Sequence, residues 1–454
     1  MFTNTRIPRL LLAACLATGG ISLQSCVEKK SNTFEQVAFG SAQQMVPALL
    51  TRNASIGSPE EQAKTQAIYQ ELKQAILSNP EDYTSRLKLA QLFMLEARAT
   101  GEHGYYYPAT LGVLDQLIEA NPAEDVTFGA YSLRASVLLS LHQFEAARKA
   151  AEYAISLNGY NALIYGSLVD ANVELGHYEE AVKMSDKMNS IRPDLRSYSR
   201  VSYLREIYGD LDGAIEAMNM AAESGYPGFE ETAWCRLTLG GLYEKKGDLK
   251  TAKAHYERIL QERADYPFAI AALGRVADKE GNPALAETLL KEAIDIIPEV
   301  AFYEDLAALY LKTGREAESQ LLVKEILTML QDDEQAGHVM KMAYSRVYLE
   351  LKNDPKKALD YALEEYRERP DNIEVNQLLA EIYLKLDDLE QAKAHLAVAT
   401  RTNASNPDLM CIEGIAKAWS FQLEEAQQLV SASFELDPYQ DHLFVKEARK
   451  LLQD

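Results

Sequence analysis

The sequence predicts an all-α solenoid, that is, a row of helical hairpins in which each hairpin packs only against its neighbours. Three observations predict this fold: a short phrase recurs along the chain, its copies stand at nearly constant spacing, and the composition favours helix. Glycine and proline, which weaken helices, account for only 23 and 15 of the 454 residues. Such a length does not require several separate cores, because a solenoid grows by adding repeats.

The recurring phrase sets the period. "LGHYEEAV" at 175–182 returns as "LHQFEAAR" (141–148), "KGDLKTAK" (246–253), "LDDLEQAK" (386–393) and "SFQLEEAQ" (420–427). We call the small residue at the seventh position of each copy the marker residue, and successive marker residues stand 33 to 39 positions apart. They are Ala147, Ala181, Ala214, Ala252, Ala286, Ser319, Ala358, Ala392 and Ala426.

Residues at fixed distances from the marker residues indicate how each unit folds. A helix-ending proline often stands twelve residues after the marker residue, as in Pro193 and Pro370, and a small residue often stands twelve before it, as in Gly240. The pattern resembles the tetratricopeptide repeat, here called TPR, over residues 82–438, with about ten repeats. This resemblance implies paired antiparallel helices, A and B, stacked into a right-handed superhelix.

The ends and the irregular places of the array carry their own expectations. Residues 60–81 are predicted to form a single helix or half repeat, and residues 439–454 a capping helix. The two longest intervals contain insertions around 224–229 and 331–338, and a stretched turn is expected over 99–110.

The N-terminus has the features of an export signal. Arg6 and Arg9 precede an apolar run, 10–23, that is too short to span a bilayer. "LQSC" at 23–26 resembles a bacterial lipobox, so residues 1–25 are expected to be a lipoprotein signal peptide and Cys26 the acylated residue. Cys15 in "LAAC" is the alternative cysteine, and ordinary cleavage or a retained leader is a further alternative. In lipoproteins of this type an aspartate after the cysteine marks retention in the inner membrane, so with Val27 at that position the resemblance implies an outer-membrane anchor, on the periplasmic side rather than the surface.

Residues 26–59 are polar and irregular, and we expect them to form a tether. The alternative is a short helix near 41–50 that caps the array.

Charge and cysteine content exclude some classes of function. A net charge of −22 argues against nucleic acid as a partner. Cys235 and Cys411 stand 176 residues apart in different repeats, so we expect free thiols inside helices.

The chain contains no HExxH, GxxxxGK[ST], GxGxxG, GxSxG or CxxC motif, and no two of its seven histidines stand four residues apart. The sequence therefore predicts a protein that is not an enzyme and that needs no cofactor and no metal.

In the TPR family, one stripe of helix A lines a concave groove that takes extended or helical peptides. Counted back from the marker residues, this stripe concentrates aromatic and arginine side chains within 196–278, and such side chains dominate binding hot spots. Tyr203, Trp234, Phe268 and Arg275 are the candidate groove residues. The alternative for Trp234 and Phe268 is that they only pack at helix starts.

Two functions remain open. The first is a non-catalytic scaffold, anchored in the bacterial envelope by its lipid, that organises a complex of envelope proteins through the TPR groove. The second is a lipoprotein that captures a glycan or small ligand, similar to the SusD-like proteins. Those carry long insertions that build a sugar site, whereas the units here run almost without interruption.

Overall fold

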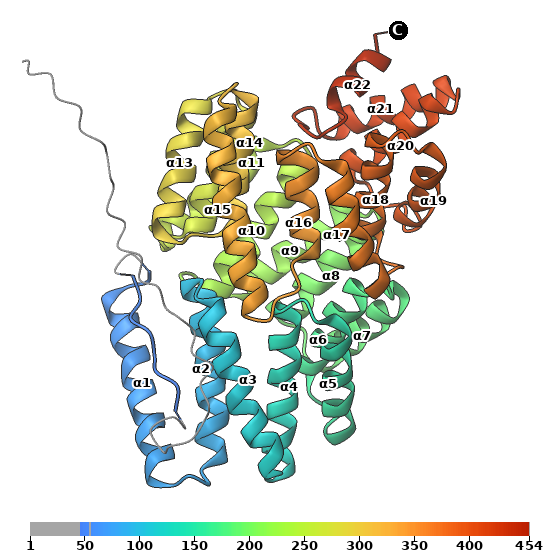
Figure 1. Cartoon of the computed structure of the whole chain (residues 1–454). Coiled ribbons are helices and arrows are strands. Elements are labelled where there is room, and N and C mark those ends of the chain that lie inside the picture. Colours follow the sequence, from blue (N-terminus) through green and yellow to red (C-terminus); the bar gives the residue numbers. More distant parts are fainter. Residues whose placement is uncertain (1–45, 54–55, 454) are drawn as a thin grey trace, which may run out of the picture. The chain divides into compact units, whose positions relative to one another are not determined.

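Helices account for almost the whole of the computed structural model, which describes residues 46–53 and 56–453 (Figure 1). Within these residues there is no β-strand, and consecutive helices pair as antiparallel hairpins. The predicted all-α solenoid is confirmed. No helix among the described residues is long and apolar enough to cross a lipid bilayer.

Ten hairpins follow one another, each made of a helix A and a helix B. They are α2 (Tyr83–Thr100) with α3 (His103–Ala120), α4 (Glu124–Ser140) with α5 (Phe144–Leu157), α6 (Ala162–Glu174) with α7 (Tyr178–Ile191), α8 (Leu195–Ile207) with α9 (Leu211–Ser224), and α10 (Glu230–Lys245) with α11 (Leu249–Glu262). The next five are α12 (Pro267–Lys279) with α13 (Pro283–Ile296), α14 (Val300–Lys312) with α15 (Glu316–Gln335), α16 (Lys341–Arg346) and the π-helix η2 (Val347–Leu351) with α17 (Pro355–Glu368), α18 (Ile373–Lys385) with α19 (Leu389–Ala399), and α20 (Pro407–Trp419) with α21 (Leu423–Leu436).

Within the residues that the structure describes, one helix without a hairpin partner stands at each end of this row. α1 (Pro59–Ser78) packs on α2 as each helix B packs on the helix A that follows it. α22 (Val445–Leu451) packs on α20, as other A helices pack on the helix A two elements earlier.

The marker and small residues explain why the phrase recurs. Ala147, Ala181 and Ala252 are fully buried, because helix B begins there against its partner helix A. Gly240 on helix A lies so close to Tyr256 on helix B that an added Cβ atom would stand 2.3 Å from the Tyr256 ring. A small residue here lets the two backbones approach closely.

The irregular places differ in part from the expectations. The insertion at 224–229 forms the loop between α9 and α10, whereas that at 331–338 mostly lengthens α15. The stretched turn expected over 99–110 is wrong: α2 continues to Thr100 and α3 begins at His103, with Pro108 inside the helix. Pro108 is the sixth residue of α3, beyond the first turn, so it removes one i→i−4 hydrogen bond and leaves the carbonyl of Gly104 without its usual helical donor.

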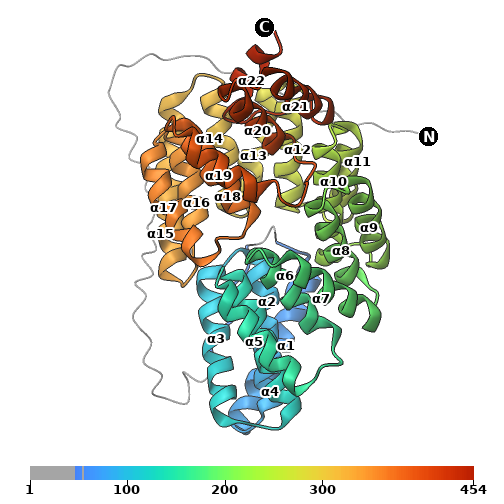
Figure 2. The same cartoon turned by 90° about the vertical axis from the view of Figure 1, so that its right-hand side faces the viewer.

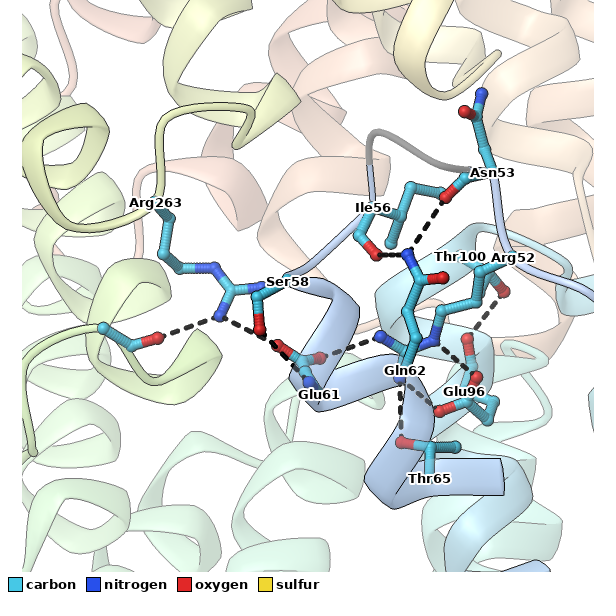
Figure 3. Close-up of polar contacts among 11 residues, drawn as sticks. Arg52, Asn53, Ile56, Ser58, Glu61, Gln62, Thr65, Glu96, Thr100 and Arg263 are labelled. Carbon is cyan, nitrogen blue, oxygen red and sulfur yellow. Dashed lines mark hydrogen bonds and ion pairs between the residues drawn. The ribbon is translucent and has the colours of Figure 1, made fainter. Parts of the chain in front are cut away.

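The predicted tether over 26–59 is wrong for residues 46–53, which pack on α1, α2 and α3. Val46 is buried, and the backbone N–H of Leu50 donates to the Tyr106 hydroxyl at 3.0 Å. Arg52 donates to both carboxylate oxygens of the buried Glu96 and to Glu61 (Figure 3). Residues 46–50 are not helical, and the rest of the alternative capping helix lies outside the described residues, as do the leader, Cys15 and Cys26.

The solenoid also contacts itself far along the chain (Figure 2). We call the turn between helix A and helix B of one hairpin an A–B turn, and the connection to the next hairpin a B–A loop. Five A–B turns lie against five later B–A loops, and we call this set of contacts the seam. The turns are 101–102, 141–143, 175–177, 208–210 and 246–248, and the loops are 297–299, 336–340, 369–372, 400–406 and 437–444.

Polar contacts dominate the seam. Val339 donates its backbone N–H to the carbonyl of Leu141, and Ser405 donates its hydroxyl to the carbonyl of Gly209, each at 3.0 Å. Arg401 donates to the carbonyl of Gly176 at 2.6 Å and lies over the ring of Tyr178. Most hydrogen bonds across the seam join residues 194 to 199 positions apart. One full turn of the superhelix therefore takes a nearly constant number of residues.

Glycines in the seam allow backbones to touch. Gly176 has φ +83°, and a Cβ atom there would lie 2.3 Å from the carbonyl carbon of Asp371. Gly314 occupies the equivalent position of a later hairpin, with φ +77°, but has nothing within 4 Å of its Cβ position.

These two glycines provide a matched test of the seam. Gly176→Ala and Gly314→Ala should each lose about 1 kcal/mol of unfolding free energy, because both place a side chain in left-handed backbone. Gly176→Ala should lose a further ~1–3 kcal/mol, since its neighbour is backbone that cannot move aside. Urea unfolding of the two variants and the wild type measures the difference; equal losses would contradict a seam that contributes to stability.

Candidate functional site

The concave side of the solenoid holds two cavities, of about 470 and 520 Å³. Side chains from helix A of several hairpins line them, together with residues of the seam. Arg346 and Glu374 line both cavities, so the two are adjacent. We call the smaller one the first cavity and the larger one the second cavity.

The first cavity lies where the fourth to sixth helices face α14, α16 and α17. Its apolar lining comprises Leu139, Phe144, Val339, Met340, Met342 and Ala343. Its charged lining comprises Asp170, Glu174, Glu304, Glu365 and Glu374, with Arg346 and Arg369 as the basic groups. Arg369 is committed to the seam, because it pairs with Glu174 and Glu365 and lies 4.8 Å from the centre of the Phe144 ring.

The second cavity contains two of the predicted groove residues, Tyr203 of α8 and Arg275 of α12. Arg275 pairs with Asp305 at 3.3 Å and with Glu244 at 3.9 Å, which holds its guanidinium in the cavity wall. Burial, with the nearby carboxylates of Glu374 and Glu174, raises the pKa of Tyr203 well above its usual value. Its hydroxyl is therefore a protonated donor at neutral pH.

A π-helix aims the arginine that the two cavities share. Arg346 ends α16 directly before η2, and its side-chain contact with Glu350 is long, at 3.3 Å. A π-helix carries extra residues per turn and shifts the faces of a helix, a device common at functional sites. Arg346, directly before this π-helix, lines both cavities at their boundary, where a ligand can contact it.

Two carboxyl groups of these walls, Glu304 and Glu174, have raised pKa values. Burial raises the pKa of Glu304 to about 7, and the nearby Glu350 and Asp305 add to this effect. Burial also raises the pKa of Glu174 to about 7, although Arg369 stands beside it. A buried carboxyl group is costly to ionise, so the concave wall is partly protonated near neutral pH.

The other two predicted groove residues lie elsewhere. Phe268 packs between the rings of Tyr266 and Phe302, with ring centres 5.5 and 5.4 Å away, inside the hydrophobic clusters of α12 and α14. Trp234 is 44% exposed near the start of α10 and lines neither cavity. The structure thus brings Tyr203 and Arg275 together and separates them from Phe268 and Trp234.

Several cavity residues were not selected from the sequence. Glu374 and Gln377 stand 18 and 15 residues before Ala392, so the same count applied to the later repeats finds them. Arg346 escapes this count because η2 alters the spacing, and the seam residues escape it because no local pattern links positions so far apart.

The remaining chemistry of the described residues is sparse. Cys235 and Cys411 are free and buried, as predicted, and burial raises the pKa of each thiol to about 12. The described part of the chain contains no group of three or more His, Cys, Asp or Glu side chains placed to hold a metal ion.

Comparison with known proteins identifies the repeat. Residues 211–403 match the family model described as tetratricopeptide repeat. A thermophilic TPR protein of Thermus thermophilus is similar at 20% identity and TM-score 0.36, with 43% of this chain and 97% of that one covered. A TPR protein of Parabacteroides merdae gives 15% identity and TM-score 0.35, with 57% and 97% covered. Human IFIT1, in a dimer with m7Gppp-AAAA, gives 12% identity and TM-score 0.44, with 83% and 87% covered. Among curated proteins, none matches this chain.

Glu304 allows a test of the cavity's electrostatics. Its carboxyl group binds a proton between about pH 4.5 and 7 in the folded protein but not in the unfolded chain, so this group lowers stability as pH rises through that window. Glu304→Gln should therefore gain about 1 kcal/mol over the wild type between pH 5 and pH 8, allowing for partial hydration.

Urea unfolding at both pH values gives this difference, and buried histidines, which titrate in the same range, cancel between variant and wild type. Glu119→Gln, at an exposed position of α3, is the control and should show no such change. A gain that is the same at both pH values would rule out a raised pKa.

Proposed function

Since this chain is a tetratricopeptide repeat protein, we propose that it is a non-catalytic scaffold that binds a segment of a partner protein on its concave side. The TPR fold suggests protein–protein interaction, and TPR proteins are generally non-catalytic.

One observation carries the choice of site: side chains from helix A of consecutive hairpins converge on the second cavity, with Tyr203 and Arg275 among them. Tyrosine and arginine are enriched among residues that dominate binding energy. The lining combines carboxylates with Lys245, Arg275, Lys279 and Arg346, and also includes the loop residues 404–406 and the start of α20. A peptide segment offers both charged side chains and backbone groups, so it suits such a wall.

The proposed location is the bacterial envelope. A lipid on Cys26 would anchor the chain to the outer membrane, and stable anchoring requires more than one acyl chain, as bacterial lipoproteins carry. The partner would then be an envelope protein, and nucleic acid is not expected as a partner at a net charge of −22.

Removal of Tyr203 tests the cavity. In a crosslinked pull-down from native envelopes with a C-terminal tag, Tyr203→Ala should recover the partner at least about tenfold less than the wild type, since hot-spot truncations exceed ~1.4 kcal/mol. Tyr153→Ala, at a half-exposed position of α5, is the control and should keep full recovery. Thermal unfolding of both variants checks that the fold is intact. Equal recovery from all three proteins would move the site away from this cavity, and no partner at all would contradict the scaffold.

Substitution of the lipidated cysteine tests the anchor separately. Cys26→Ala should move the protein from the membrane pellet to the soluble envelope fraction, because the acyl chains attach through that thiol. Cys15→Ala should leave it in the pellet. If the two variants exchange these behaviours, Cys15 is the processed residue; if neither leaves the membrane, the lipid anchor is wrong.

A further inference from the structure

The seam uses only half of the A–B turns in this chain. No described B–A loop contacts the five later turns themselves, 280–282, 313–315, 352–354, 386–388 and 420–422. The loop 437–444 reaches only the helix ends before the first two, where Asp437 lies 3.9 Å from Lys279 and Asp441 lies 2.8 Å from Lys312. Gly281 and Gly314 have nothing within 4 Å of their Cβ positions, whereas a Cβ atom added at Gly176 or Gly209 would lie 2.3 Å from backbone of the facing loop. We call these five turns the open turns.

The B–A loops show the opposite asymmetry. The five earliest, 79–82, 121–123, 158–161, 192–194 and 225–229, are largely exposed, and no earlier turn of the superhelix lies against them. We call them the open loops. The loop at 263–266 comes next and already reaches back, since Arg263 lies 3.9 Å from Glu61 of α1. The molecule thus has five open turns at one edge and five open loops at the other.

The two unpaired helices have complementary types. Among the described residues, α22 packs as a helix A with no helix B after it, and α1 packs as a helix B with no helix A before it. If α22 of one copy and α1 of another form one hairpin, the seam continues without a break. We propose that a second copy of this chain docks there, its open loops lying on the open turns of the first copy as loops lie on turns within the seam.

This arrangement predicts which open turn meets which open loop. Continuing the order of the seam, 280–282 faces 79–82 of the second copy, and 420–422 faces 225–229. The last pair is the most apolar on both sides: Phe421 is 93% exposed, while Tyr226 and Phe229 are 77% and 62% exposed. Exposed aromatic side chains on both partners favour a contact that removes them from water.

The backbone at Phe421 supports a docking role. Its φ is +62°, in a position that glycine, asparagine or aspartate occupies in most of the other A–B turns. A bulky residue in left-handed backbone is unfavourable, and such strain clusters at functional sites. The fold of a single copy does not explain why an exposed aromatic side chain stands in this unfavourable backbone conformation.

Opposite charges support the same register at the preceding pair of open turn and open loop. The turn 386–388 carries the exposed Asp387, and it faces the loop 192–194 of the second copy, which carries Arg192. Arg192 pairs at present only with its neighbour Asp194, at 3.1 Å, and its side chain is 70% exposed. Docking would therefore add an ion pair between copies.

The contact joins unlike surfaces, so it has no twofold symmetry and each copy can accept another. With −22 on each copy, repulsion opposes assembly, and added salt screens it. Association should strengthen with ionic strength. It does not involve the cavities, so Tyr203→Ala should associate as the wild type does.

Sedimentation of the full-length chain in mild detergent, over a wide range of concentration and salt, tests the proposal. The wild type should shift with concentration from monomer to dimer and larger species. Phe421→Asp should weaken association at least tenfold, while Leu321→Asp, at an exposed site on α15 away from both edges, should not. Monomer throughout, or equal effects of the two variants, would overturn the proposal.

A charge exchange tests the register itself. Asp387→Arg and Arg192→Asp should each weaken association, and the double variant should regain most of it, because the ion pair is restored with its signs exchanged. Thermal unfolding of the single variants should match the wild type. Association that the double variant fails to regain would place the second copy in another register or on another surface.

Discussion

The rest of this structure depends on the contact between an A–B turn and the B–A loop about 195 residues later. Solenoids are held by contacts between neighbouring repeats, so distant repeats are normally coupled only through those between them. Here hydrogen bonds such as Val339 to Leu141 and Ser405 to Gly209 join distant repeats directly. Each is worth only about 1 kcal/mol, but such bonds join three of the five turns to their loops, and close packing at Gly101 and Gly247 joins the other two, so the superhelix is held at one pitch.

The pitch in turn creates the site. Helix A faces the concave side in every hairpin, and closing the seam brings α14–α18 over α4–α8, so the two cavities lie between successive turns of the superhelix. Carboxylates such as Glu174 and Glu304 become buried by this approach, which is why the pKa of each rises to about 7. The electrostatics of the concave wall are therefore a consequence of the seam rather than of any single repeat.

The local parts of the fold were predictable because they recur. The marker residues located the hairpins, since each hairpin solves the same packing problem with an alanine or a glycine at the same place. Of the four groove residues, Tyr203 and Arg275 lie in the cavity as the stripe on helix A implies. Phe268 does not, because aromatic side chains at a helix start also pack between hairpins, and hydrophobic pattern alone does not separate the two uses. Residues 46–53 look like a tether in sequence, yet Arg52 binds the buried Glu96, a pairing of residues 44 positions apart.

The sequence by itself determined the class of fold, the number and order of the hairpins and the positions of their turns, because these follow from short-range periodicity. Only the tertiary structure decided which turns are covered, which carboxylates are buried and which arginine reaches both cavities. The physical reason is distance along the chain. The period of the superhelix is the sum of small rotations between neighbouring hairpins. A long α15 or the π-helix η2 changes that sum, and the sequence of one repeat does not give the size of the change.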